Sequence, residues 1–161
     1  MSKLKQVTVY TDGACIGNPG PGGYGVILIY GELRKELSGG YRLTTNNRME
    51  LMAAIKGLSA LKEPCQVILF SDSEYLVKAI NKGWVKRWKE NDWHRSNKKQ
   101  AVNSDLWAEL LRLCDKHRII FEWVRGHNGH LENERCDKLA FLAAQQSDLI
   151  EDHGYKQSGS D

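Results

Sequence analysis

The order in which strand-like and helix-like patterns follow one another constrains the fold of this chain most. Two segments with β-branched and aromatic residues come first, at residues 6–11 and 24–30, and a hairpin turn at Gly31-Glu32 predicts a third, more polar strand at 33–41. The period then changes to that of an amphipathic helix, with apolar residues three and four positions apart from Leu51 to Leu61. The run Val67 to Phe70 is entirely apolar, which is typical of a central strand buried on both faces. This switch from strands to alternating elements predicts an α/β protein.

The second half of the chain continues the alternation. The remaining elements are expected at 73–82 (helix), 106–117 (helix), 119–124 (strand) and 131–144 (helix). Together these elements predict a single α/β domain with a five-stranded mixed sheet flanked by helices. We assign residues 1–147 to this domain and expect 148–161 to form a flexible, polar C-terminal tail.

Composition excludes several classes of protein. The chain has 161 residues, of which 41% are hydrophobic and 27% charged, so it can bury a core of its own. No apolar stretch approaches the roughly 20 residues that span a bilayer, and no signal-peptide core follows the N-terminal lysines. The four cysteines form no CxxC pair, which argues against a zinc site and against a disulfide framework. We expect a cytoplasmic protein with no membrane partner.

Basic residues are concentrated in one segment, at about 82–99. It holds seven lysines and arginines against two acidic residues, although the whole chain carries a net charge of only +3. Trp84, Trp88 and Trp93 lie among them, and aromatic rings with lysines are typical of surfaces that bind nucleic acids. The same tryptophans could instead form a small satellite core that anchors a protruding element. We expect a mixture of the two.

Polar residues follow three of the predicted strands. Asp12 and Gly13 end the first, Asp72 follows the fourth, and Arg125-Gly126-His127 follows the fifth. Ligands of open α/β sheets bind at the carboxyl ends of parallel strands, so these side chains are expected to meet. Taken singly, an aspartate after a strand is more often a turn former or a helix cap, and His127 could simply bond a backbone carbonyl.

Two further carboxylates, Glu50 and Asp137, lie beside the apolar faces of their helices. Singly, either could form a surface ion pair. Carboxylates that converge without lysine or arginine partners repel one another, and a divalent cation would neutralise them. Oxygen ligands suit Mg²⁺ or Mn²⁺, and two such ions roughly 3.5–4 Å apart catalyse phosphodiester hydrolysis. Asp12, Glu50, Asp72 and Asp137 therefore predict a metal-dependent nuclease.

The glycine-rich stretch from Gly17 to Gly23 is expected to be a turn. Gly20 to Gly25 matches G-x-G-x-x-G, but it leads into a strand and does not open a helix, so the context for dinucleotide binding is absent. Contact between its backbone and a substrate phosphate is a second interpretation.

Six motifs, in order, resemble those of bacterial ribonuclease HI. They are Tyr10–Cys15, Gly17–Gly23, Thr45–Leu51, Ser71–Ser73, Trp123–His127 and Asn133–Asp137. The resemblance runs from about Lys5 to Tyr155. It implies a ribonuclease H-like domain, typically monomeric, that cleaves the RNA strand of RNA–DNA hybrids endonucleolytically and leaves 3′-hydroxyl and 5′-phosphate ends.

The resemblance also implies roles for individual residues. Asp12, Glu50, Asp72 and Asp137 would ligate two Mg²⁺ ions, with Asp12 bridging both, and Mn²⁺ could substitute. His127 would assist proton transfer or product release. The residues expected to contact the hybrid are Gly13, Cys15, Asn18, Asn46, Glu74, Trp84, Lys86, Arg87, Trp88 and Lys89. The last five belong to the basic segment, which would hold the DNA strand.

Three departures from the family pattern bear on affinity. Glu74 stands where well-known bacterial members have glutamine, Glu90 and Asp92 dilute the basic segment, and Gln100 replaces a frequent proline. Two alternative functions stay open at this point. One is a related metal nuclease that acts on DNA, such as a junction resolvase or an integrase core. The other is a hybrid-binding module without catalysis.

Overall fold

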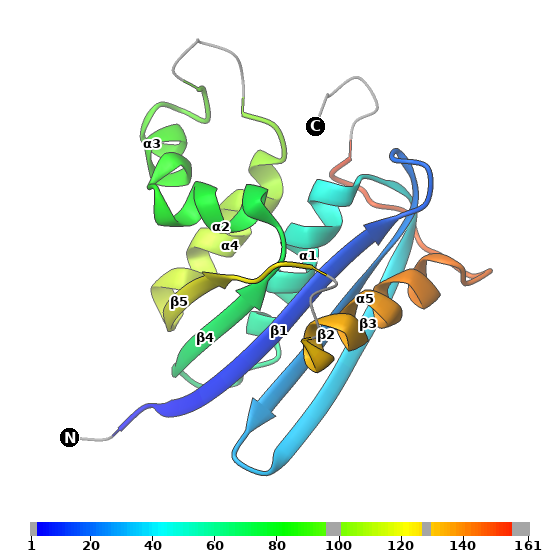
Figure 1. Ribbon diagram of the computed structural model, residues 1–161. Coiled ribbons are helices and arrows are strands. Elements are labelled where there is room, and N and C mark those ends of the chain that lie inside the picture. Colours follow the sequence, from blue (N-terminus) through cyan, green and yellow to red (C-terminus); the bar gives the residue numbers. More distant parts are fainter. Residues whose placement is uncertain (1–2, 96–100, 127–129, 156–161) are drawn as a thin grey trace.

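The computed structural model describes residues 3–95, 101–126 and 130–155, and its centre is one mixed sheet (Figure 1). The strands are β1 (Lys5–Cys15), β2 (Gly20–Tyr30), β3 (Leu33–Thr44), β4 (Cys65–Ser71) and β5 (Arg118–Trp123). Their spatial order is β3-β2-β1-β4-β5. Strand β1 pairs antiparallel with β2 and parallel with β4, which in turn pairs parallel with β5. The predicted five-stranded mixed sheet is confirmed.

Helices cover the sheet on both faces. They are α1 (Asn46–Ser59), α2 (Glu74–Asn81), α3 (Trp84–Glu90), α4 (Ser104–Lys116) and α5 (Leu131–Ala144). Helix α5 lies across β1, β2 and β3 on the face nearer the viewer in Figure 1, and α1 packs on β1 and β2 from behind. The main core fills the space between α1, α4 and the sheet, with Leu58, Leu69 and Trp107 fully buried. In the described part of the chain, no helix is long and apolar enough to span a membrane.

Strand β1 is longer than its sequence predicts. Its parallel pairing with β4 ends at Thr11 and Ser71, but its antiparallel pairing with β2 continues to Cys15. Asp12 therefore lies where the parallel ladder ends, although the strand itself does not end there.

The glycine-rich stretch from Gly20 onward is a strand, not a turn. β2 begins at Gly20, and a β-carbon on Gly23 or Gly25 would overlap the backbone of α5 at Ala140 or Cys136. The glycines thus allow a helix to lie directly on the sheet, and composition alone does not distinguish this close packing from a turn.

The tail is also more ordered than expected, as far as Tyr155. The backbone N–H of Arg42 donates to the carbonyl of Ile150 at 2.8 Å, and Ile150 forms a parallel bridge with Tyr41. Asp152 is buried and bonded to the body of the protein. Residues 150–155 therefore pack on β3 and α1, because a buried carboxylate holds them there.

Candidate metal centre

Three carboxylates from three elements meet at one edge of the sheet. Asp12 comes from β1, Glu50 from α1, and Asp72 from the residue after β4. One oxygen of each lies within 4.8 Å of the others, which is close enough for a shared cation. Asp12 and Glu50 are only 2% and 5% exposed, while Asp72 is partly buried. The expectation that these strand-end and helix-face residues converge is confirmed for these three.

Gly13 fixes the relative position of two of them. Its backbone N–H donates to Asp12 Oδ1 at 2.9 Å and to Glu50 Oε1 at 2.8 Å. A β-carbon at this position would overlap the backbone of α1 at Met49 and Glu50. The sequence indicated an Asp-Gly strand end here, so this close approach of strand to helix was not predicted.

Asp72 is held by the segments on either side of it. Ser73 caps α2 by accepting the N–H of Leu76 at 3.1 Å, and the Trp123 indole donates to the Asp72 carbonyl at 3.1 Å. A β-carbon at Gly126 would come within 2.6 Å of Asp72 Oδ2, so the segment after β5 packs on this carboxylate. The next residue, His127, lies outside the described residues, and its role stays a prediction.

Asp137 is close to the cluster without belonging to it. It is partly buried on α5, outside the group of three. Its charge nevertheless contributes to the raised pKa values of Asp12 and Glu50. Asp137 therefore acts on this cluster through its charge, and its part in holding a metal stays a prediction.

The electrostatics of this cluster are unfavourable without a cation. Burial, followed by the neighbouring carboxylates, raises the pKa values of Asp12 and Glu50 well above their ordinary range. Within the described ranges, no lysine or arginine forms an ion pair with either of them or with Asp72. A divalent cation fits this donor set, because it would neutralise the repulsion and because its preferred ligands are oxygens.

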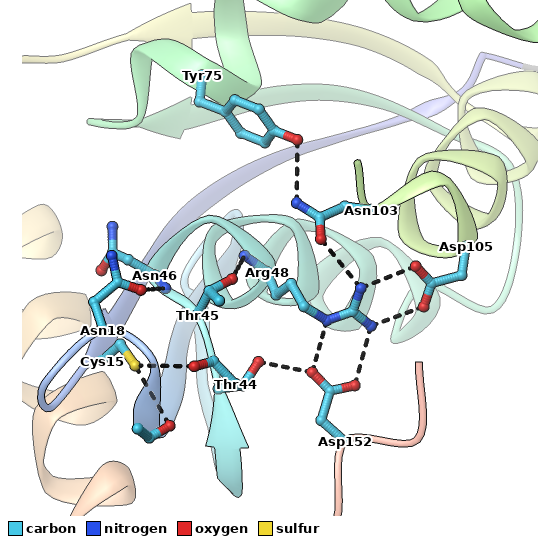
Figure 2. A network of polar contacts seen from close by, with 11 residues as sticks. Cys15, Asn18, Thr44, Thr45, Asn46, Arg48, Tyr75, Asn103, Asp105 and Asp152 are labelled. Atoms are coloured by element: carbon cyan, nitrogen blue, oxygen red, sulfur yellow. Dashed lines mark hydrogen bonds and ion pairs between the residues drawn. The ribbon is translucent and has the colours of Figure 1, made fainter. Parts of the chain in front are cut away.

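Three of the predicted substrate contacts, Cys15, Asn18 and Asn46, lie together near the start of α1, the helix that carries Glu50 (Figure 2). The Asn46 N–H donates to Asn18 Oδ1 at 2.9 Å, which joins the β1–β2 loop to the start of α1. The Cys15 thiol donates to the carbonyl oxygens of Thr44 and Gly20 at 3.4 and 3.5 Å. Glu74 lies apart at the start of α2, where its exposed carboxylate pairs with Lys78.

The basic segment combines anchoring and exposed residues, as expected. Trp88 is partly buried, with its ring 6.2 Å from that of Trp107, whereas Trp84 is exposed beneath the ammonium group of Lys82. Lys86, Arg87 and Lys89, the other predicted contacts, are all exposed on α3. Val85 is the one buried residue of this short helix. Lys98, Lys99 and Gln100 lie outside the described residues.

Sequence reasoning missed one buried polar centre near the site. Arg48 lies two positions before Glu50 on α1 and is 2% exposed. It bonds to Asp152, Asp105 and Asn103 (Figure 2). No local pattern in the sequence pointed from Arg48 to the tail.

Comparisons with known proteins agree with this geometry. Residues 4–145 match the family model described as RNase H. The chain is 67% identical over 151 residues to "Ribonuclease H" of Syntrophus aciditrophicus, covering 94% of this chain and 87% of that protein. It is 56% identical over 155 residues to "Ribonuclease HI" of a Synechocystis species, covering 96% and 97% of the two chains.

A solved structure shows the same fold. The crystal structure of LC9-RNase H1, described as a type 1 RNase H with the type 2 active-site motif, superposes with a TM-score of 0.80 at 34% identity. The match covers 89% of this chain and 74% of that one. With the carboxylates, the sheet order and these similarities in agreement, the chain belongs to the ribonuclease H family, as a bacterial ribonuclease HI.

Proposed function

We propose that the protein is a Mg²⁺-dependent endoribonuclease that hydrolyses the RNA strand of RNA–DNA hybrids and leaves 3′-hydroxyl and 5′-phosphate ends. The observation that carries the proposal is the buried group of Asp12, Glu50 and Asp72, which lacks a cationic partner among the described residues. Family membership supports ribonuclease activity on hybrids. The protein would act as a monomer in the cytoplasm.

Asp12, Glu50, Asp72 and Asp137 would hold two Mg²⁺ ions, with Asp12 shared between them, and Mn²⁺ could replace Mg²⁺. When bound, such ions activate a water for attack on the phosphorus and stabilise the leaving 3′ oxygen. The chain supplies rigidity. The Gly13 amide fixes Glu50 against Asp12, and the capped start of α2 fixes Asp72. This preorganisation means that little rearrangement is needed at the moment of reaction.

The two surfaces beside the carboxylates would divide the substrate between them. Cys15, Asn18 and Asn46 offer polar groups to the RNA strand, whose 2′-hydroxyls line the wide minor groove of a hybrid. Glu74 lies on the same path. The basic segment, with Lys86, would hold the phosphates of the DNA strand, with exposed Trp84 as a ring for contact with it. His127 would assist proton transfer or product release.

The test uses labelled RNA–DNA hybrid, RNA duplex and DNA duplex, each with Mg²⁺, with Mn²⁺ or with chelator. We expect cleavage of RNA in the hybrid alone, dependent on the metal, with products that polynucleotide kinase labels only after their 5′-phosphate has been removed. Cleavage of the DNA duplex would indicate a DNA nuclease of the same fold. Retention of the hybrid without cleavage in Mg²⁺ would leave a binding module.

A further inference from the structure

Arg48 is the centre of a buried network that the proposed chemistry does not use (Figure 2). Nε and Nη2 donate to Asp152 at 2.7 and 3.0 Å, and Nη1 and Nη2 donate to Asp105 at 2.9 and 2.7 Å. Nη1 also donates to Asn103 Oδ1 at 3.2 Å. All five N–H groups of the guanidinium are therefore used, and three partners fix its position.

Asp152 brings the C-terminal tail into this network. Its Oδ2 accepts from Arg48 Nε and from Thr44 Oγ1, each at 2.7 Å. Burial opposes its ionisation, but these hydrogen bonds outweigh burial and hold the Asp152 pKa below its ordinary value. A β-carbon at Gly154 would overlap the Asp105 carboxylate and the guanidinium, so the tail backbone packs directly on the ion pairs.

On one side, the network reaches the polar surface next to the carboxylates. Thr44 is the last residue of β3, and its carbonyl accepts from the Cys15 thiol. Two residues later, the Asn46 N–H bonds to Asn18. As Figure 2 shows, Asp152 thus bonds to the junction between β3 and α1 at which the three proposed RNA-strand contacts meet.

On the other side, the network reaches the basic segment. Asn103 Nδ2 and Trp107 Nε1 both donate to the hydroxyl of Tyr75, at 3.2 and 3.0 Å. Trp107 in turn makes an edge contact with the ring of Trp88. A continuous set of contacts therefore runs from the tail through Arg48 to an anchoring residue of the proposed DNA-strand surface.

We propose that Asp152 is a positioning residue for hybrid binding. Through Arg48 and Thr44 it holds the Asn18–Asn46 surface and the base of the basic segment in one fixed geometry, and it touches no substrate itself. The inference rests on the proposed function, because it requires that both surfaces engage one duplex. A duplex is rigid over this length, so a small displacement of either surface weakens the contact of the other.

The experiment measures KM and kcat for a hybrid, at a temperature where circular dichroism shows each variant to be folded. Asp152→Asn removes the charge but keeps the shape, and we expect KM to rise about fivefold to tenfold with kcat within about twofold. The dependence of KM on salt should not change, because every residue proposed to bind phosphate is still present. Asp148→Asn, an exposed carboxylate of the same tail, is the matched control and should leave KM unchanged.

Thr44→Val keeps the test decisive if Asp152→Asn does not fold. It removes one hydrogen bond to Asp152 and leaves Arg48 with all its partners, so we expect a folded protein with a smaller rise in KM. Wild-type KM in Thr44→Val, or lost activity in Asp152→Asn that follows the unfolded fraction at unchanged KM, overturns the inference.

Hybrid binding in chelator, measured by fluorescence anisotropy, separates this inference from the proposed function. The ranking of Kd values should match that of KM, with Asp152→Asn weakest. A wild-type protein that binds the hybrid but never cleaves it contradicts the proposed function alone. Equal Kd values for wild type and both variants contradict the positioning role alone.

Discussion

Arg48 and Glu50 are buried charged residues two positions apart on α1, and their surroundings are opposite in kind. Arg48 has a complete set of partners within the protein, including two carboxylates. Among the described residues, Glu50 accepts one backbone hydrogen bond, from Gly13, and its other charged neighbours are the carboxylates Asp12, Asp72 and Asp137. A buried charge is costly unless it is compensated. The charge of Arg48 is therefore compensated by the fold itself, whereas the charge of Glu50 would need an external cation to compensate it.

The largest expected effect comes from removing charge on the uncompensated side. Asp12→Asn should lower kcat by at least about 10³-fold in Mg²⁺, because it removes the shared ligand of the proposed two-ion site. The same change should raise the Tm in chelator, because it relieves burial of a charge among like charges. Cleavage rates and thermal unfolding of the same preparations test both effects.

Mg²⁺ provides the control for this variant. It should raise the Tm of the wild-type protein, because a ligand that binds only the folded state stabilises it, and it should have a much smaller effect on Asp12→Asn. A variant that stays active and metal-dependent would contradict the assignment of Asp12 as the shared ligand.

The second effect concerns Arg48, whose charge is compensated by Asp152 and Asp105. Arg48→Met leaves Asp152, whose side chain is 4% exposed, without its cation, and should lower the free energy of unfolding by about 3–5 kcal/mol. Arg112→Met breaks an exposed pair with Glu109 and should cost no more than about 0.5 kcal/mol. Urea unfolding in chelator measures both. Equal losses of unfolding free energy in the two variants would show that the buried network stabilises the fold no more than an exposed ion pair does.

The two regions also differed in how far the sequence predicted them. Asp12, Asp72 and Glu50 could be placed together because strand ends and helix faces are set by local periodicity. Asp152 could not, because its partner Arg48 is 104 positions away and the tail has the polar composition of a loose end. Pairing of distant charges leaves no local pattern.

The same reasoning explains two errors in secondary structure. Gly23 lies in a stretch with the composition of a turn, and only the close packing of α5 makes it a strand residue. Helix α3 was not predicted, because it buries little besides Val85 and carries its exposed charges over the rest of its surface. For the glycine a tertiary contact, absent from the local pattern, decides the structure. For α3 the buried surface is too small to leave an apolar periodicity in the sequence.

A third, smaller effect concerns the basic segment, in which Lys86, Arg87 and Lys89 are exposed. Replacing Lys86, Arg87 and Lys89 by alanine should raise KM about tenfold at low salt and flatten the dependence of KM on salt by up to about 0.9 for each phosphate that the segment no longer neutralises. The control replaces Lys35, Lys56 and Lys62, which are exposed lysines outside this segment. If the two triple variants show the same KM and the same salt dependence, net charge alone explains binding, and the basic segment is not the binding surface.

The smallest effect is a pH dependence of the unfolding free energy that arises from Asp152, the buried partner of Arg48. The Asp152 pKa is held low in the folded protein, so its ionised form contributes stability above the unfolded-state pKa of about 3.9. That contribution is lost as the pH falls through the lowered folded-state value. The difference in unfolding free energy between wild type and Asp152→Asn should therefore be constant above about pH 5 and shrink below about pH 4.

Urea unfolding in chelator from about pH 7 to about pH 2.5 measures this difference, and protonation of the Asp12–Glu50–Asp72 cluster cancels because both proteins contain it. Asp148→Asn, exposed and without a cation partner in the described part of the chain, should show no such difference at any pH. A gap between wild type and Asp152→Asn that persists unchanged at the acidic end of this range would mean that shape and hydrogen bonding, and not charge, hold the tail. Charge compensation of Arg48 by Asp152 would then not be what distinguishes Arg48 from Glu50.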